Sequence, residues 1–145
     1  AHVITCATNT SVPLFDGNWL EPGQHVTGMI GSNVQLVEAG TRPKRRRELD
    51  DGTISRADVI VTNLRESLMI EQHGDLFEPL EQGLIAMEDV FELAELITGK
   101  CPGRMSDEQI TCHKNTNGIG AADLGISMRA YELAKAAGRG TIIEL

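Results

Sequence analysis

The stretch Asp58-Val-Ile-Val-Thr62 decides the fold. Its four β-branched residues lie between the polar residues Asp58 and Asn63, and such a run is typical of a buried strand. Helical patterns lie on both sides of it in the sequence. An alternation of strands and helices favours an α/β protein with a mainly parallel sheet.

The rest of the chain repeats this alternation. Further strands are predicted at 2–8, 25–30, 110–114 and 141–145. Helices are predicted at 47–57, 64–72, 75–82, 88–98 and 121–137. Gly74 is expected to end the second of these helices in a left-handed conformation, and Gly83 to end the third.

Composition excludes several classes of protein. The 145 residues are enough for one domain, and the net charge of −8 would repel nucleic acid. The three cysteines form no paired motif, which favours a reducing cytoplasm. No apolar run reaches the roughly 20 residues of a membrane span. The histidines lack metal-ligand spacing, so no metal site is expected. Because the chain opens without Met, directly on a strand, we expect it to be a piece of a longer protein.

Three segments resemble the ornithine cyclodeaminase/mu-crystallin family. They are VITCATNTSVPLFDGNWL (3–20), PGQHVTGMIGSN (22–33) with RRELD (46–50) after it, and GRMSDEQIT (103–111). The stretches GDLFEPLEQGLI (74–85) and FELAELITGK (91–100) also fit. The resemblance covers nearly the whole chain.

The resemblance implies a partial Rossmann-like, doubly wound sheet. In the family such a domain binds NAD or NADP, and a second domain combines the amino-terminal part with a returning carboxy-terminal segment. Residues 1–110 would be the second half of the nucleotide domain, and residues 111–145 the returning helix and strand. The glycine-rich phosphate loop should precede residue 1. Gly118-Ile119-Gly120 does not replace it, since the third glycine is missing and Asp123 would repel pyrophosphate.

The resemblance also implies site residues. Asn33 stands where family cyclodeaminases have an Asp, and an amide cannot abstract a proton at neutral pH. This favours a ketimine reductase or amino-acid dehydrogenase over a cyclodeaminase, unless Asn33 is only a turn residue. The cofactor would be bordered by residues that follow the strands: Cys6, Ala7, Thr8, Met29, Ile30, Gly31, Ser32 and Lys114.

Other interpretations of these residues stay open. Cys6 also fits a small buried hydrophobe, and Lys114 an ordinary surface lysine. The basic cluster at 42–47 would attract a carboxylate or a phosphate, or be merely solvated. The stretch 34–45 is longer than the family resemblance leads us to expect, next to the expected site.

The implied reaction is hydride transfer between NAD(P) and the α-carbon of a small amino or imino acid. Lacking the phosphate loop, the isolated chain is expected to bind the cofactor weakly or not at all and to show no turnover. The alternative is a non-catalytic assembly module. Its strand at 2–8 would have an unpaired edge, which tends to recruit another strand. The partner would be a second copy or the missing amino-terminal half.

Overall fold

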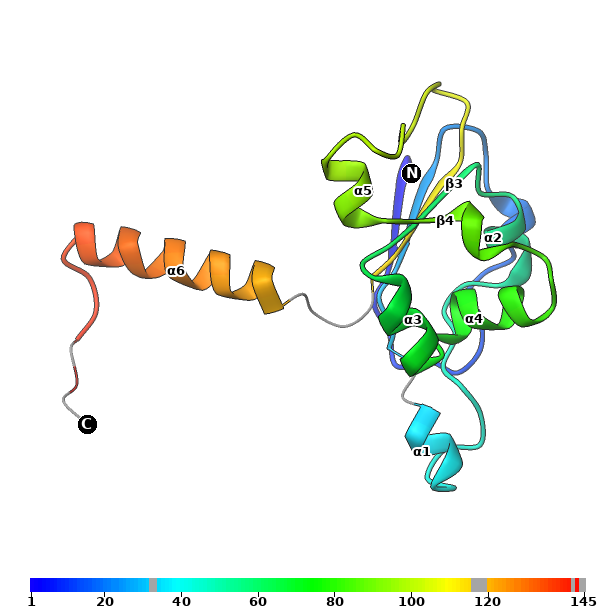
Figure 1. Cartoon of the computed structure of the whole chain (residues 1–145), viewed down its shortest axis with the longest axis horizontal. Coiled ribbons are helices and arrows are strands. Elements are labelled where there is room, and N and C mark those ends of the chain that lie inside the picture. The colour runs from blue at the N-terminus through cyan, green and yellow to red at the C-terminus, as the bar shows by residue number, and fades with distance from the viewer. Residues whose placement is uncertain (32–33, 116–119, 142, 144–145) are drawn as a thin grey trace.

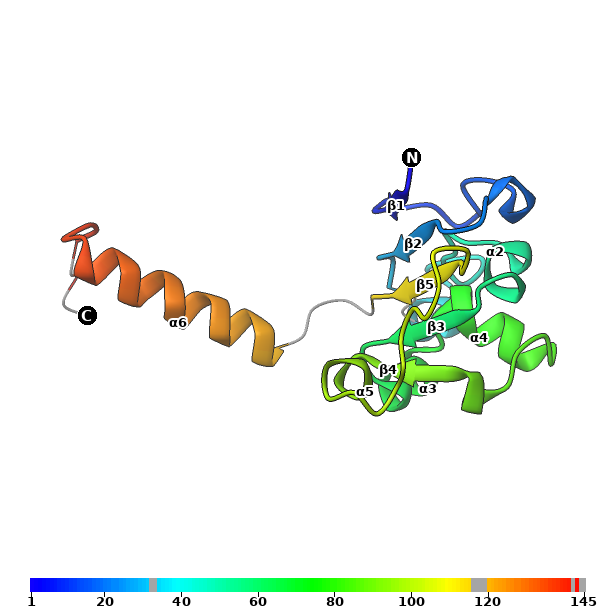
Figure 2. The same ribbon diagram turned by 90° about the horizontal axis from the view of Figure 1, so that it is seen from above.

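The computed structural model describes residues 1–31, 34–115, 120–141 and 143. Five parallel strands form one sheet in the order β1-β2-β5-β3-β4 (Figure 2). The strands are β1 (Val3–Cys6), β2 (His25–Gly28), β3 (Val59–Thr62), β4 (Val90–Glu92) and β5 (Thr111–Lys114). The predicted α/β class with a parallel sheet is confirmed.

The helices cover the two faces of the sheet unequally (Figure 1). Successive side chains of a strand point to opposite faces. On β3, Ile60 packs in the main core with residues of α2 (Asp51–Ser55), α3 (Arg65–Glu71) and α4 (Gly74–Glu81). Val59 and Val61 pack in a smaller cluster with residues that include Leu93 of α5 (Leu93–Ile97). One face is therefore well covered and the other only in part.

The helix predicted at 88–98 is wrong in its first half. The segment forms a short 3-10 helix, η2 (Met87–Asp89), then β4 and only then α5. Val90 is fully buried and opposite Ile60 of β3 in the sheet. Pairing with a buried strand overrides the helical spacing of the apolar residues, because it satisfies backbone groups that would otherwise be buried without partners.

The junction at Gly74 also differs from the prediction. Gln72, with φ of 48°, takes the left-handed position after α3, and Gly74 instead begins α4. A Cβ on Gly74 would lie 2.5 Å from the carbonyl oxygen of Arg46. Glycine is therefore required for close packing of two backbones and not for a turn.

The helix predicted at 47–57 is shorter than expected. It begins at Asp51, since the side chain of Asp50 accepts a hydrogen bond from the amide of Thr53 and caps it. Arg47, Glu48 and Leu49 precede the helix and are buried. A short helix that was not predicted, α1 (Val34–Glu38), lies in the long stretch at 34–45 and projects from the body (Figure 1).

The last helix, α6 (Gly120–Ala136), extends away from the sheet (Figures 1 and 2). It agrees closely with the helix predicted at 121–137. Its large apolar side chains are all exposed: Leu124, Ile126, Met128, Tyr131 and Leu133. The strand predicted at 141–145 falls mostly outside the described residues.

Candidate active site

The carboxyl ends of β1, β2 and β5 meet at one edge of the sheet, where open α/β sheets bind their ligands. The residues expected to border a cofactor lie there. Ala7, Thr8 and Met29 are exposed, whereas Cys6 and Ile30 are buried. Gly31 is buried beside Ile30, and Lys114 ends β5. The structure thus brings the three predicted segments together. Ser32 and Asn33 lie outside the described residues.

Glu48, in the RRELD motif, joins two of these segments. Its Oε1 accepts hydrogen bonds from the amide and the hydroxyl of Thr8, the latter at 2.8 Å. Its Oε2 accepts from the amides of Met29 and Ile30, at 2.8 and 2.9 Å. Burial alone would raise the pKa of Glu48, yet these hydrogen bonds outweigh it and hold the pKa below its usual value. Glu48 is therefore a carboxylate at neutral pH.

Asp75 and Lys114 form an ion pair directly beneath the same edge. The two charged atoms are 2.8 Å apart, and neither side chain is exposed. Lys114 also donates a hydrogen bond to the carbonyl oxygen of Ile30, and Asp75 Oδ1 accepts from the amides of Glu48 and Leu49 at 2.7 and 3.0 Å. Lys114 is thus not a surface lysine. Its ammonium group holds the loop after β2 through the hydrogen bond to Ile30.

Two further predictions concern Cys6 and the basic cluster. Cys6 is in the main core, and burial raises the pKa of its thiol to about 11. The side chain of Cys6 is thus a small buried hydrophobic group, while its backbone lies at the candidate site. In the basic cluster, Arg45 pairs with Glu81, and Arg47 with Asp51 and Glu78. Those two arginines therefore form ion pairs within the fold.

The family motifs also fasten the loop between β1 and β2. Asp50 accepts a hydrogen bond from the amide of Gly17 at 2.9 Å, and Arg56 donates to the carbonyl oxygens of Gly17 and Leu20. A Cβ on Gly17 would lie 2.1 Å from the amide nitrogen of Thr53. The Asp-Gly-x-Trp-Leu turn is therefore held to α2 by direct backbone contact.

Sequence reasoning missed Glu48 and Asp75 as residues of the site. Both lie in motifs that carry the resemblance, RRELD and GDLFEP. Asp75 stands beside the apolar residues Leu76 and Phe77, which was an available signal, because an acidic residue is rarely buried without partners. Glu48 stands among charged residues in RRELD, so its motif gave no such signal.

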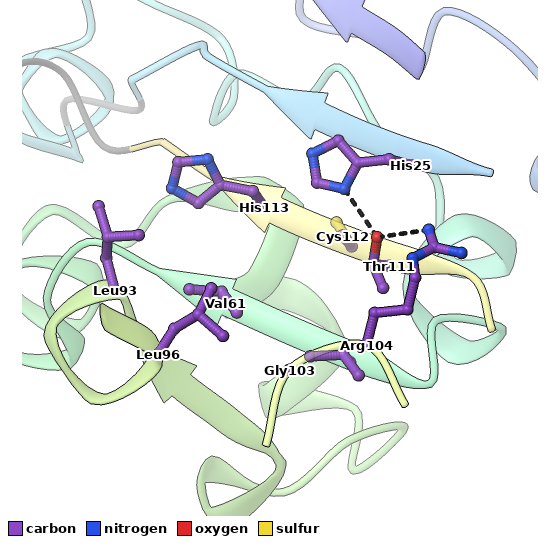
Figure 3. Close-up of a pocket in the computed structure, with 10 residues that line it drawn as sticks. His25, Val61, Leu93, Leu96, Gly103, Arg104, Thr111, Cys112 and His113 are labelled. Carbon is purple, nitrogen blue, oxygen red and sulfur yellow. Dashed lines mark hydrogen bonds between the residues drawn. The ribbon is translucent and has the colours of Figure 1, made fainter. Parts of the chain in front are cut away.

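A separate hollow of about 260 Å³ lies on the less covered face of the sheet, between α5 and strands β2, β3 and β5 (Figure 3). Thr111 accepts a hydrogen bond from Arg104 and contacts His25, so the polar groups there bond to one another. The residues predicted to bind the cofactor do not line this hollow. The predicted residues lie at the sheet edge and not at this hollow.

No helix in the described part of the chain is long and apolar enough to cross a membrane. Within the same residues, no group of three or more His, Cys, Asp or Glu side chains is arranged to hold a metal ion.

Comparison with known proteins identifies the class. The model of the ornithine cyclodeaminase/mu-crystallin family matches residues 1–138, and the chain belongs to that family. It is 34% identical over 145 residues to a Δ1-pyrroline-2-carboxylate reductase of Bacillus cereus, covering 99% of this chain and 41% of the relative.

Solved structures agree. The Thermococcus litoralis Δ1-pyrroline-2-carboxylate reductase in complex with NADH and L-proline superposes with a TM-score of 0.80 at 27% identity, over 97% of this chain and 40% of that chain. The iminosuccinate reductase of Paracoccus denitrificans in complex with NAD⁺ superposes with a TM-score of 0.77 at 27% identity, over 99% of this chain and 40% of that chain. The chain thus spans about two fifths of the length of these relatives.

Proposed function

We propose that this chain supplies the nicotinamide side of an NAD(P)-dependent reductase that acts on a small imino acid. The observation that carries the proposal is the convergence of the loops after β1 and β2 at the carboxyl edge of the sheet, with Glu48 bonded to both. The relatives include reductases of cyclic and acyclic imino acids.

The residues at this edge fit the nicotinamide end of the cofactor. Ala7, Thr8 and Met29 leave their surface open beyond the strand ends, and the buried Glu48 and Lys114 are already occupied by protein groups. When bound, the cofactor supplies the hydride. The chain's own part is to hold the two loops that border the ring. We propose that the isolated chain binds the cofactor weakly or not at all and shows no turnover.

Reduction is favoured over cyclodeamination because Asn33 takes the place of the family Asp. An amide can hold a substrate or a water molecule by hydrogen bonds but cannot remove a proton at neutral pH. A reductase needs no strong base at that position, since hydride adds to an imine carbon that is already electrophilic.

The test is to join the amino-terminal part of the Bacillus cereus reductase to Ala1 and to assay the fusion protein. We expect NADH or NADPH oxidation with Δ1-pyrroline-2-carboxylate, and no release of ammonia from ornithine. A folded fusion that binds NADH and deaminates ornithine would contradict the choice of reaction. One that binds neither cofactor would contradict the proposal itself.

A second candidate is an assembly module, favoured by the place of β1. In the described residues β1 pairs with β2 alone and forms one border of the sheet, with Val3 largely exposed. Such an edge can pair with another strand. Light scattering after size exclusion should then show a dimer or larger species, and a Val3→Pro variant should shift it towards monomer. A monomer at high concentration would contradict this candidate.

A further inference from the structure

Glu48 connects two loops that are far apart in the sequence. One carboxylate oxygen receives the amide and hydroxyl of Thr8, and the other receives the amides of Met29 and Ile30. The Glu48 side chain is fully buried, so its carboxylate is shielded from water and from salt, although Thr8 and Met29 are themselves exposed. The amide of Met29 also donates to the carbonyl oxygen of Cys6 at 3.0 Å, where β1 and β2 end. Beyond that backbone contact, the two loops are joined by this one side chain.

Only a carboxylate of this length can serve both loops. All the partners are donors, so both terminal atoms must be acceptors. A glutamine would present its NH₂ group, which is itself a donor, to either Thr8 or the amides of Met29 and Ile30. An aspartate is one methylene shorter and could not reach both sets of donors without moving a loop.

The loop after β2 is also held from the other side. The amide of Ile30 donates to Glu48, while its carbonyl oxygen accepts from Lys114. Lys114 pairs with Asp75, and Asp75 accepts from the amide of Glu48. This closed network fixes the orientation of the peptide groups around Ile30, because linked buried hydrogen bonds reinforce one another.

We propose that Glu48 is a positioning residue that sets the distance between the Thr8 loop and the Met29–Ile30 loop, and through them the orientation of the nicotinamide ring. This inference rests on the proposed function. Glu48 itself lies beneath the loops and does not touch the ring. Its effect is on the backbone that does.

The test uses the ¹⁵N-labelled full chain, with nicotinamide mononucleotide at millimolar concentration as the probe. In the wild-type chain the probe should shift the amide resonances of Thr8, Met29 and Ile30. In Glu48→Gln the affinity read from these shifts should fall by about tenfold or more, the loss of a charge-assisted hydrogen bond. Glu81→Gln, the same change at an exposed carboxylate, should match the wild type.

The outcomes separate the two proposals. Equal affinity in Glu48→Gln and the wild type would overturn the role of Glu48 and leave the proposed function standing. A wild-type chain whose three amides do not respond to the probe would overturn the role of Glu48, whereas the proposed function is decided by the fusion protein. If Glu48→Gln does not fold, the wild-type spectrum decides. The amide protons of Thr8, Met29 and Ile30 should be shifted downfield and protected from exchange, and ordinary, unprotected amides would refute the proposal.

Discussion

Lys114 at the end of β5 and Asp75 in the first turn of α4 form an ion pair of 2.8 Å with no solvent exposure on either side chain. The pair links the centre of the sheet to the helical layer, directly beneath the edge where the cofactor is expected. A buried pair of this kind costs free energy to desolvate, and removing one partner leaves a buried charge without compensation.

Lys114→Met should therefore destabilise the fold by about 3–5 kcal/mol, measured as the free energy of unfolding in urea. The double variant Lys114→Met/Asp75→Leu should regain much of that loss, since no isolated charge then remains. A single variant as stable as the wild type would show that the pair contributes nothing.

Gly17→Ala should be strongly destabilising, by roughly 3 kcal/mol, because its Cβ would overlap the backbone of α2. Gly125→Ala is the matched control. Its Cβ would meet nothing within 4 Å, and it should raise the helicity of α6 by circular dichroism. If both variants unfold at the same urea concentration, the contact between Gly17 and α2 is not formed.

The stability of the fold should fall as the pH drops from about 6.5 towards 4. Burial, aided by Lys114, lowers the pKa of His73 from 6.5 to about 4. Between these values the unfolded chain binds the proton and the folded chain does not, so acid favours unfolding. The contribution of His73 is present above pH 6.5 and is on the order of 3 kcal/mol.

Chemical denaturation at several pH values, in the wild type and in His73→Gln, measures this contribution. The free energy of unfolding of the variant should depend less on pH between about 4 and 6.5. Some dependence should remain, because burial also lowers the pKa values of His25 and His113. His2→Gln, at an exposed position, should behave as the wild type. An unchanged slope in His73→Gln would disprove the assignment.

The three cysteines should resist alkylation in the folded protein. Burial raises the pKa of Cys6 to about 11 and that of Cys112 to about 12, and Cys101 is also buried. Since the thiolate is the reactive form, iodoacetamide at mildly alkaline pH should label none of them until urea is added. Mass spectrometry counts the labels. Rapid labelling of Cys112 under native conditions would be the contrary result.

Local sequence patterns predicted most of the strands but missed β4, which forms by pairing with its neighbour in the sheet. The β-branched run at 58–62 and the apolar run at 2–8 formed strands β3 and β1 within a few residues. Val90 could not be identified as a strand residue from spacing alone, because its strand exists only through pairing with β3. Such long-range pairing has no local signal.

The resemblance named the backbone segments of the candidate site, and the contacts of Glu48 and Asp75 beneath them were not predicted. The backbone segments at 6–8 and 29–31 lie together as expected. The contacts of Glu48 and Asp75 join residues up to 40 positions apart in the sequence, so no motif spacing reveals them. What a sequence cannot show is which donors will surround a buried carboxylate once the chain has folded.

The projecting helix α1 has a consequence for engineering. Helix α1 and the turn after it project from the body, and the chain is packed against α4 again from Arg45 onward. The hydrogen bond between Ile30 and Glu48 lies at the base of this excursion. For a flexible loop, each doubling of length costs only about 0.6 kcal/mol. The excursion should therefore accept a grafted epitope or peptide tag near Gly40, where nothing lies within 4 Å of an added side chain, without disturbing the network below.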